Sequence, residues 1–169
     1  AISETTLRTL RYRFLYATAR KVTPPHQLPT IVLAHHADDQ AETILLRLVR
    51  GAGIRGVRGM QPVTQHFAPQ LNEYVRIVRP LLDVRQSEIV RYLHDQNVGW
   101  REDPTNLSFD YARNRIRHKV LPELIKINPQ AVESIVRSAK VLEEGAERMA
   151  RMDQSLLDSL QIGEMSSQR

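Results

Sequence analysis

The spacing of hydrophobic positions changes several times along the chain, and each change predicts a different element. Leu7, Leu10 and Phe14 recur at helical spacing after Ser3, a suitable N-cap, which predicts an opening helix that ends before a pair of prolines. Residues 30–34, TIVLA, form a short apolar run without alternation. Such a run is typical of a strand that is covered on both faces in a parallel sheet.

A helical period returns immediately after this strand. Between residues 38 and 50, the apolar positions Ala41, Ile44, Leu45 and Leu48 share one helical face. The sequence therefore predicts a strand followed by a helix, which is the repeating unit of α/β folds.

An alternating segment predicts a second strand. Val75, Ile77 and Arg79 occupy every second position and are followed by a proline. Residues 61–73, which precede this strand and contain two prolines, predict a variable loop. A turn is predicted at Pro104, because the residue before a proline avoids helical geometry.

Local signals predict three helix boundaries. Asp83 and Gln86 resemble a capping box at a helix start, and Pro122 should end or kink a basic helix near Leu121. Asn128 predicts the cap of a long final helix, which the following proline begins. The buried stripe expected on that helix comprises Val132, Ile135, Val136, Ala139, Leu142, Ala146 and Met149.

Composition narrows the class of protein. The chain has 169 residues, of which 41% are hydrophobic, and no run approaches the roughly 18 consecutive apolar residues of a membrane span. Cysteine is absent, which excludes disulfides and thiolate metal sites and favours the cytoplasm. The formal charge is +5, and 20 of the 24 basic residues are arginine, which binds phosphate bidentately. This balance fits either ordinary solvated charge or an anionic partner such as RNA.

Candidate chemistry is concentrated in the stretch LAHHADDQAET. It places His35, His36, Asp38, Asp39 and Glu42 where the first strand passes into the helix, at the edge where α/β sheets bind ligands. Glu42 can share a helical face with either aspartate. Carboxylates brought together repel unless a cation, a proton or a cationic substrate neutralises them, so the cluster predicts a site for a positive group. The alternative is an aspartate that caps the helix beside histidines that bond to a loop.

Two further segments are basic. Residues 50–60, RGAGIRGVRGM, allow close backbone approach to phosphate, but they match no phosphate-loop pattern and also suit a flexible surface loop. In the later basic helix Arg113 and Arg117 share a face, while Arg115 points elsewhere. With Asn114, these arginines suit either a polyanion or a solvated helix.

Four of these segments together resemble one family. HHADDQAETILLRLVRGAGIRGVRGM, VRPLL, WREDPTN and YARNRIRHKVLPEL occur in the order and spacing of the tRNA(Ile)-lysidine synthetases, over most of residues 7–124. The resemblance implies an α/β fold. Residues 1–124 would be part of a parallel-sheet, adenine nucleotide α-hydrolase-like (N-type ATP pyrophosphatase) domain, and residues 125–169 a helical linker.

The resemblance also implies an activity. The family ligates lysine to the wobble cytidine of tRNA(Ile) with anticodon CAU, using ATP and magnesium. ATP adenylates the cytosine carbonyl oxygen, and the lysine amine then displaces AMP. The expected location is the cytoplasm or the plastid stroma, with no membrane partner, and a homodimer is left open.

Site residues are carried over position by position. Asp39 resembles the acidic group near magnesium and the triphosphate. His35 and Glu42 resemble groups that hold lysine or orient the target base. Arg113 resembles the arginine that contacts the nucleotide or the adenylated cytosine, and Arg115 and Arg117 are the second choices.

One family motif does not occur in this sequence. The family opens with SGGxDS, a phosphate loop that binds the triphosphate, and the chain contains no such string. We therefore expect the chain to correspond to a fragment that begins in the helix before TIVLA and to be inactive by itself.

Three alternatives remain at the level of sequence. The first is a basic RNA-binding fragment without catalysis, and the second is a different tRNA-modifying ATP pyrophosphatase. A thiolating pyrophosphatase would need catalytic cysteines, which the chain lacks. The third is a metal phosphohydrolase built on HHADD, for which His66, His94 and His118 are weakly placed additional ligands.

Overall fold

The computed structural model describes residues 4–54, 56–101 and 112–166. Ser3 and the turn expected at Pro104 lie outside the described residues. The chain divides into two compact units, which are described separately: a sheet unit of residues 1–36 and 60–91, and a helical unit of residues 37–59 and 92–169. Within the described part, no helix has the length and apolar character that a membrane crossing requires.

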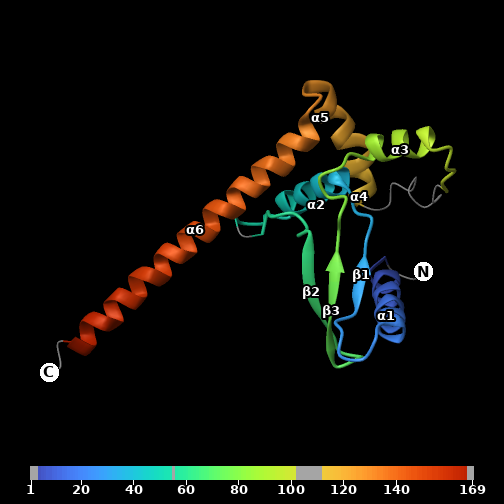
Figure 1. Ribbon diagram of the computed structural model, residues 1–169. Helices are drawn as coiled ribbons and strands as arrows, with labels where there is room; N and C mark the ends of the chain where they lie inside the picture. Colours follow the sequence, from blue (N-terminus) through green and yellow to red (C-terminus); the bar gives the residue numbers. More distant parts are fainter. Residues whose placement is uncertain (1–3, 55, 102–111, 167–169) are drawn as a thin grey trace. The chain divides into compact units, whose positions relative to one another are not determined.

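Among its described residues, the sheet unit has the strands β1 (Thr30–Val32), β2 (Val63–Ala68) and β3 (Glu73–Val78), shown in Figure 1. β3 lies in the centre, in the order β1-β3-β2. β1 is parallel to β3, with Ile31 opposite Ile77, whereas β2 is antiparallel to β3. The parallel pairing confirms the α/β class predicted from the sequence, with an antiparallel strand added.

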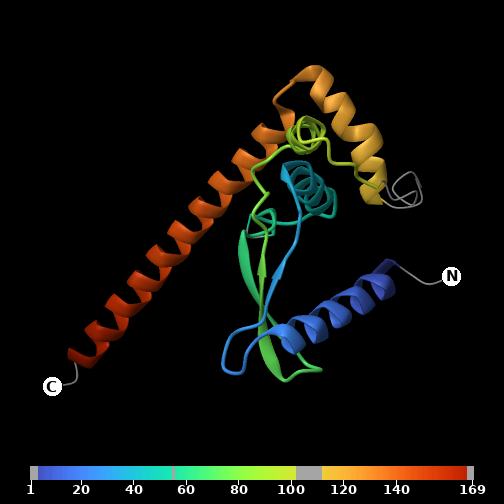
Figure 2. The ribbon, with the colours of Figure 1, turned by 45° about the vertical axis from the view of Figure 1, so that its right-hand side comes forward.

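The core of the sheet unit lies between the sheet and α1 (Glu4–Val22), which runs beside the strands in Figure 2. Val75 and Ile77 of β3 are fully buried, as their alternation predicts. Tyr16 and Ala19 of α1 pack into the same cluster.

One expectation about burial in this unit is wrong. Val32 of β1 is 65% exposed, so β1 is covered on one face and not on both. On α1, which does end before the proline pair, Leu7, Leu10 and Phe14 are all about half exposed or more. The helix packs against the sheet through Tyr16 and Ala19 instead.

The expectation of a loop at residues 61–73 is also wrong, because β2 occupies residues 63–68. The two prolines of this segment, Pro62 and Pro69, lie on either side of β2, so the hydrogen bonds of the strand remain intact. Phe67 of β2 contacts Tyr74 of β3 edge to face, with 5.3 Å between ring centroids. The connecting turn uses Asn72 at φ 50°, a conformation that asparagine tolerates well.

α3 (Gln86–Asp95) begins later than the capping-box expectation at Asp83. The side chain that reaches back is Glu88, whose Oε2 accepts a hydrogen bond from the backbone N–H of Arg85 at 2.9 Å. The pattern of Asp83 and Gln86 predicted the helix, but Glu88, the third residue of α3, determines where the helix begins.

The helical unit comprises α2 (Ala37–Val49), a helix from Ala112 to Ile127, and α6 (Ala131–Ser166). Its core joins Ala37 and Ala41 of α2 to residues of both other helices. Ile44 of α2 is also buried, as predicted, whereas Leu48 is 48% exposed.

The helix from Ala112 to Ile127 has a widened turn in its middle. The α-helical segments α4 (Ala112–Arg115) and α5 (Leu121–Ile127) flank a π-helical segment, η2 (Ile116–Val120). In this turn the N–H of Leu121 donates to the carbonyl of Ile116, five residues earlier.

An end or a kink was expected near Leu121, but the helix continues through Pro122, which follows a π turn. Proline lacks an N–H and its ring collides with the carbonyl four residues earlier in an α-helix, which a wider turn relieves. In an α-helix Ile116 and Leu121 would point about 140° apart. Here both are buried in the same core cluster.

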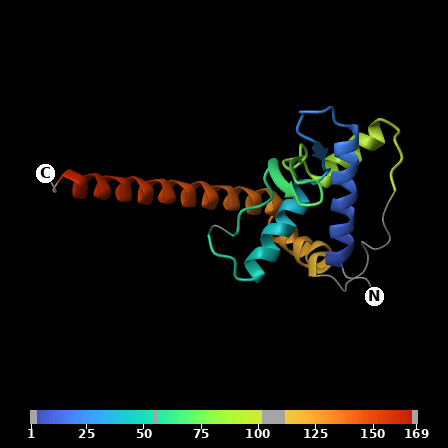
Figure 3. The same ribbon diagram turned by 90° about the horizontal axis from the view of Figure 1, so that it is seen from below.

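α6 is a single long helix, as predicted (Figure 3). The side-chain Oδ1 of Asn128 accepts a hydrogen bond from the backbone N–H of Gln130 at 3.0 Å. The regular helix begins at Ala131. The predicted stripe is buried only in its first half: Val132 is fully buried, but Met149 is 60% exposed. α2 covers the first half of α6, and the second half extends beyond it.

Candidate functional site

Two carboxylates from the HHADDQAET stretch are buried in the helical unit. Asp39 and Glu42 lie in the first turns of α2, and they are 8% and 1% exposed. They accompany Ala37, Ala41 and Ile44, which face the core of the unit. Ionised carboxylates this deeply buried require compensating positive charge.

Two arginines from the helix that begins at Ala112 supply that charge. Arg113 donates from Nε to Glu42 Oε2 at 2.7 Å and from Nη2 to Asp39 Oδ1 at 3.0 Å. Arg117 donates from Nε to Glu42 Oε1 at 2.6 Å, and from Nη2 to Asp39 Oδ1 and Glu42 Oε2, both at 3.0 Å. We call Asp39, Glu42, Arg113 and Arg117 the four-charge cluster.

The cluster balances its formal charges. Two carboxylates meet two guanidinium groups, whose side chains are 28% and 27% exposed for Arg113 and Arg117. Burial alone would lower the pKa of Arg117, but the hydrogen bond to Glu42 and the charges of Glu42, Asp39 and Asp38 outweigh it and raise that pKa above its usual value. Arg117 therefore stays charged throughout the physiological pH range.

The geometry confirms two predictions from spacing. Asp39 and Glu42 lie close together, since each guanidinium contacts both. Arg113 and Arg117 share a helical face, whereas the side chain of Arg115 is exposed. The positive group that the acidic cluster was expected to hold is, in this structure, a pair of arginines from the same chain.

His35 lies in the other unit. It follows β1 and is half-buried. Its expected role beside Glu42 therefore stays a prediction.

Asp39 fits one part of the expected magnesium chemistry. Magnesium is commonly held by one or two carboxylates, with phosphate oxygens and water completing the shell. Asp39 can supply one such carboxylate, beside guanidinium groups that suit phosphate. Among the described residues, no group of three or more histidine, cysteine, aspartate or glutamate side chains converges to hold a metal.

Sequence reasoning missed a contact between α2 and the loop that follows it. Gln40 is buried at 7% exposure, and Gly59 lies against it so closely that a Cβ there would stand 2.5 Å from Gln40 Oε1. The RGAGIRGVRGM loop therefore approaches α2, and Arg47 of that helix donates to the carbonyls of Arg58 and Gly59. The four glycines of the loop indicate that its backbone can approach another element closely, but the sequence does not indicate which glycine contacts α2.

Comparison with known proteins agrees with the sequence resemblance. The chain is similar to tRNA(Ile)-lysidine synthases of three bacteria. It is 41% identical to that of Geobacter sulfurreducens over 128 residues, covering 76% of this chain and 26% of the relative. It is 35% identical to that of Bacillus subtilis over 159 residues, covering 94% of this chain and 30% of the relative. It is 38% identical to that of Petrotoga mobilis over 144 residues, covering 85% of this chain and 42% of the relative.

These relatives are much longer than the chain, which spans between 26% and 42% of their length. A family model described as the PP-loop domain matches residues 2–124, which include β1, the four-charge cluster and the π turn. The chain belongs to the PP-loop domain family.

Proposed function

We propose that the chain is part of an enzyme that ligates lysine to the wobble cytidine of tRNA(Ile) with anticodon CAU. The observation that carries the proposal is the four-charge cluster, in which buried carboxylates lie beside guanidinium groups. Carboxylates are suitable partners for an ammonium group, and guanidinium groups are suitable partners for phosphate. The relatives named tRNA(Ile)-lysidine synthases support this choice of reaction. We also propose that residues 1–124 belong to the catalytic domain and residues 125–169 to a helical linker.

The reaction requires two displacements. The cytosine carbonyl oxygen attacks the α-phosphorus of ATP and releases pyrophosphate. The lysine amine then attacks the adenylated carbon and releases AMP. The amine must lose a proton before it attacks, which requires a nearby base.

The carboxylates take the cationic substrate in this proposal. Glu42 accepts the lysine ammonium, and Glu42 or His35 accepts the proton that the amine loses. Asp39 serves the triphosphate as a ligand of magnesium. When bound, magnesium supplies neutralising charge for the departing pyrophosphate.

The arginines take the anionic substrates. Arg113 contacts the nucleotide or the adenylated cytosine, and Arg115 and Arg117 contact phosphates of the nucleotide or the tRNA. Because Arg113 and Arg117 already occupy Glu42 and Asp39, an ammonium gains access only when the guanidinium groups turn towards phosphate. We therefore expect lysine to bind more tightly after the triphosphate or the adenylated base is present.

A second candidate is an RNA-binding piece without catalysis. The balanced cluster itself favours this candidate, since its four ion pairs also make sense as packing between α2 and the helix that begins at Ala112. A chimera separates the candidates: this chain replaces the aligned part of the Bacillus subtilis relative. Lysine-dependent AMP formation by the chimera supports ligation, whereas tRNA binding without AMP formation supports the second candidate.

A further inference from the structure

Arg79 is a buried arginine of the sheet unit, whereas the four-charge cluster belongs to the helical unit. It follows β3 directly, at the carboxyl end of that strand, and is only 7% exposed. Its Nη1 donates to the backbone carbonyl of Gln61 at 2.8 Å and to the hydroxyl Oγ1 of Thr64 at 3.2 Å. Both acceptors are neutral, so neither of them neutralises a positive charge that is costly to bury.

The other edge of the Arg79 guanidinium has no acceptor in the described part of the chain. Nη1 makes both of its side-chain hydrogen bonds, and Nε is buried without a partner. Nε and Nη2 form the edge with which Arg113 and Arg117 hold their carboxylates. Two parallel N–H donors on such an edge match two oxygens of an anion. Arg79 therefore presents an anion-binding edge to which no described residue supplies an anion.

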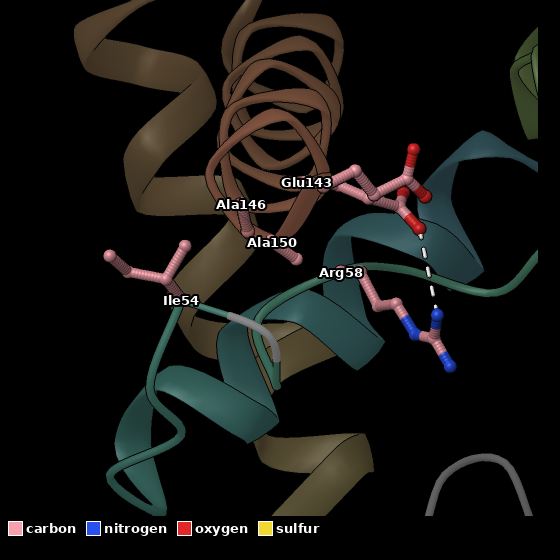
Figure 4. A pocket seen from close by; sticks show the side chains of 6 residues that line it. Ile54, Arg58, Glu143, Ala146 and Ala150 are labelled. Carbon is pink, nitrogen blue, oxygen red and sulfur yellow. Dashed lines mark ion pairs between the residues drawn. The ribbon is translucent and has the colours of Figure 1, made fainter. Parts of the chain in front are cut away.

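Other arginines of the chain lie beside a carboxylate. Arg20, in the same unit, is 3.2 Å from Glu73. Arg58 of the helical unit points towards Glu143, with 3.8 Å between Nη1 and Oε1 (Figure 4). The side chains of Arg20 and Arg58 are 28% and 55% exposed. Arg79 is buried more deeply than either, yet it has no ion pair with any residue that the structure describes.

Arg8 of α1 brings a second positive charge to the same face of the sheet. Its guanidinium lies 5.1 Å from the ring centroid of Tyr12, and that ring is 5.7 Å from the ring of Tyr16. Tyr16 packs in the core with Ile77, which precedes Arg79 by two residues and therefore shares its face of β3. α1 covers this face, beside the strands in Figure 2.

His66 adds a ring nitrogen from β2. It lies two residues beyond Thr64, the residue that Arg79 contacts, and so points to the same face of the sheet. Partial burial lowers the pKa of His66, and the positive charges of Arg79 and Arg8 lower it further. Both arginines are therefore close enough to act on this ring, which is neutral at pH 7.5 and can donate one N–H.

We propose that Arg79, Arg8 and His66 bind a phosphate group on the face of the sheet that α1 covers. Two phosphate oxygens accept from Nε and Nη2 of Arg79, and the others accept from Arg8 and His66. A tetrahedral phosphate directs its oxygens to donors on three elements, whereas a carboxylate has only two oxygens, in one plane. Two guanidinium groups also match the charge of a phosphate, about −2. The site does not depend on the proposed ligation.

The test follows the ring signal of His66 by NMR while inorganic phosphate is added to the 169-residue chain at constant ionic strength. His66→Gln identifies the signal among those of the six histidines. Phosphate should shift the signal saturably and raise the pKa of His66, because the anion offsets the charges of both arginines. Acetate should bind at least about tenfold more weakly, since it makes fewer charge-assisted hydrogen bonds. A His66 signal that does not respond to phosphate, or responds equally to acetate, would overturn the proposal.

Variants assign the binding to the arginines. Arg8→Gln should weaken phosphate binding about fivefold, as expected for one exposed charge pair. Arg13→Gln, at an exposed position on another face of α1, is the matched control and should change it by less than about twofold. Arg79→Lys retains the charge but loses the two-donor edge, so binding should fall at least about tenfold where circular dichroism shows a folded chain. Equal phosphate affinities of Arg8→Gln and Arg13→Gln would contradict the site even if Arg79→Lys does not fold.

A free phosphate ion and the terminal phosphate of a nucleic acid share this chemistry, and two oligonucleotides separate them. A short uridine oligonucleotide with a 5′-phosphate is compared with the same oligonucleotide ending in a 5′-hydroxyl. A His66 response to the phosphorylated oligonucleotide alone supports a site for terminal phosphates. A response to neither, with the response to inorganic phosphate intact, supports a site for the free ion. Equal responses to both would show that the site does not select a phosphate group and would overturn the assignment.

Discussion

Arg117 Nε donates to Glu42 Oε1 at 2.6 Å, across 75 positions of the sequence. The contact joins the second turn of α2 to a π turn, and with Arg113 it encloses Glu42 almost completely. Because Glu42 is 1% exposed, removing its charge leaves two guanidinium groups with too few partners. The stability of the helical unit and the proposed chemistry therefore depend on the same side chain.

Glu42→Gln should lower the free energy of unfolding by about 3 kcal/mol, since breaking a buried ion pair leaves uncompensated charge. Urea unfolding measures the change. Glu144→Gln is the matched control: its parent residue is exposed on α6, so a change of less than about 0.5 kcal/mol is expected. Equal effects of the two substitutions would mean that the cluster contributes no more than surface charge does.

Gly59→Ala should destabilise the helical unit by about 1–2 kcal/mol, because the new Cβ meets the buried Gln40 side chain. Gly53→Ala is the control, since nothing lies within 4 Å of its Cβ position. That substitution should be neutral or slightly stabilising. In a Gln40→Ala background the cost of Gly59→Ala should fall, and a double-mutant cycle measures the coupling.

Arg115→Gln and Arg117→Gln should separate RNA binding from stability. The Arg115 side chain is exposed, so its replacement should weaken tRNA binding and reduce the salt slope by about 1 without affecting unfolding. Replacement of Arg117, which makes three hydrogen bonds in the cluster, should lower both stability and affinity. Unchanged tRNA affinity in both variants would argue against this helix as an RNA-binding surface.

The sheet unit should lose stability as the pH falls from 7.5 to 5.5. Burial lowers the pKa of His66 on β2, and the positive charges of Arg79 and Arg8 lower it further. The unfolded chain, with a histidine pKa of about 6.5, then binds more protons than the folded chain, so acid favours unfolding. Urea midpoints at the two pH values should differ less in His66→Gln than in the parent chain. An identical pH dependence would exclude His66 as the cause.

The spacing of the charged residues predicted which of them share a helical face. The i, i+3 and i, i+4 spacings of Asp39 with Glu42 and of Arg113 with Arg117 predicted shared faces, because helical geometry is local. That the two pairs bind each other is a tertiary contact between helices far apart in the sequence, and no local pattern contains it. The expectation of an external cation followed from this gap.

The errors in the fold have the same origin. β2 was interpreted as a loop because its prolines are breakers, although both flank the strand. The helical spacing of Leu7, Leu10 and Phe14 predicted the helix α1 but not its packed face, because what covers a face depends on neighbouring elements. The π turn before Pro122 was not predicted: an end or a kink was expected there, because periodicity analysis assumes a constant helical turn.

The central claim is that the four-charge cluster carries lysine ligation, and one measurement tests it most directly. AMP release is followed in the Bacillus subtilis chimera with ATP and tRNA, in the presence and absence of lysine. The parent chimera should release AMP only with lysine. Asp39→Asn and Glu42→Gln, assayed where circular dichroism shows them folded, should be at least about a hundredfold slower. Glu144→Gln should match the parent, and the 169-residue chain alone, which contains no SGGxDS, should release none. Lysine-dependent AMP release at the parental rate in folded Asp39→Asn and Glu42→Gln chimeras would contradict the claim.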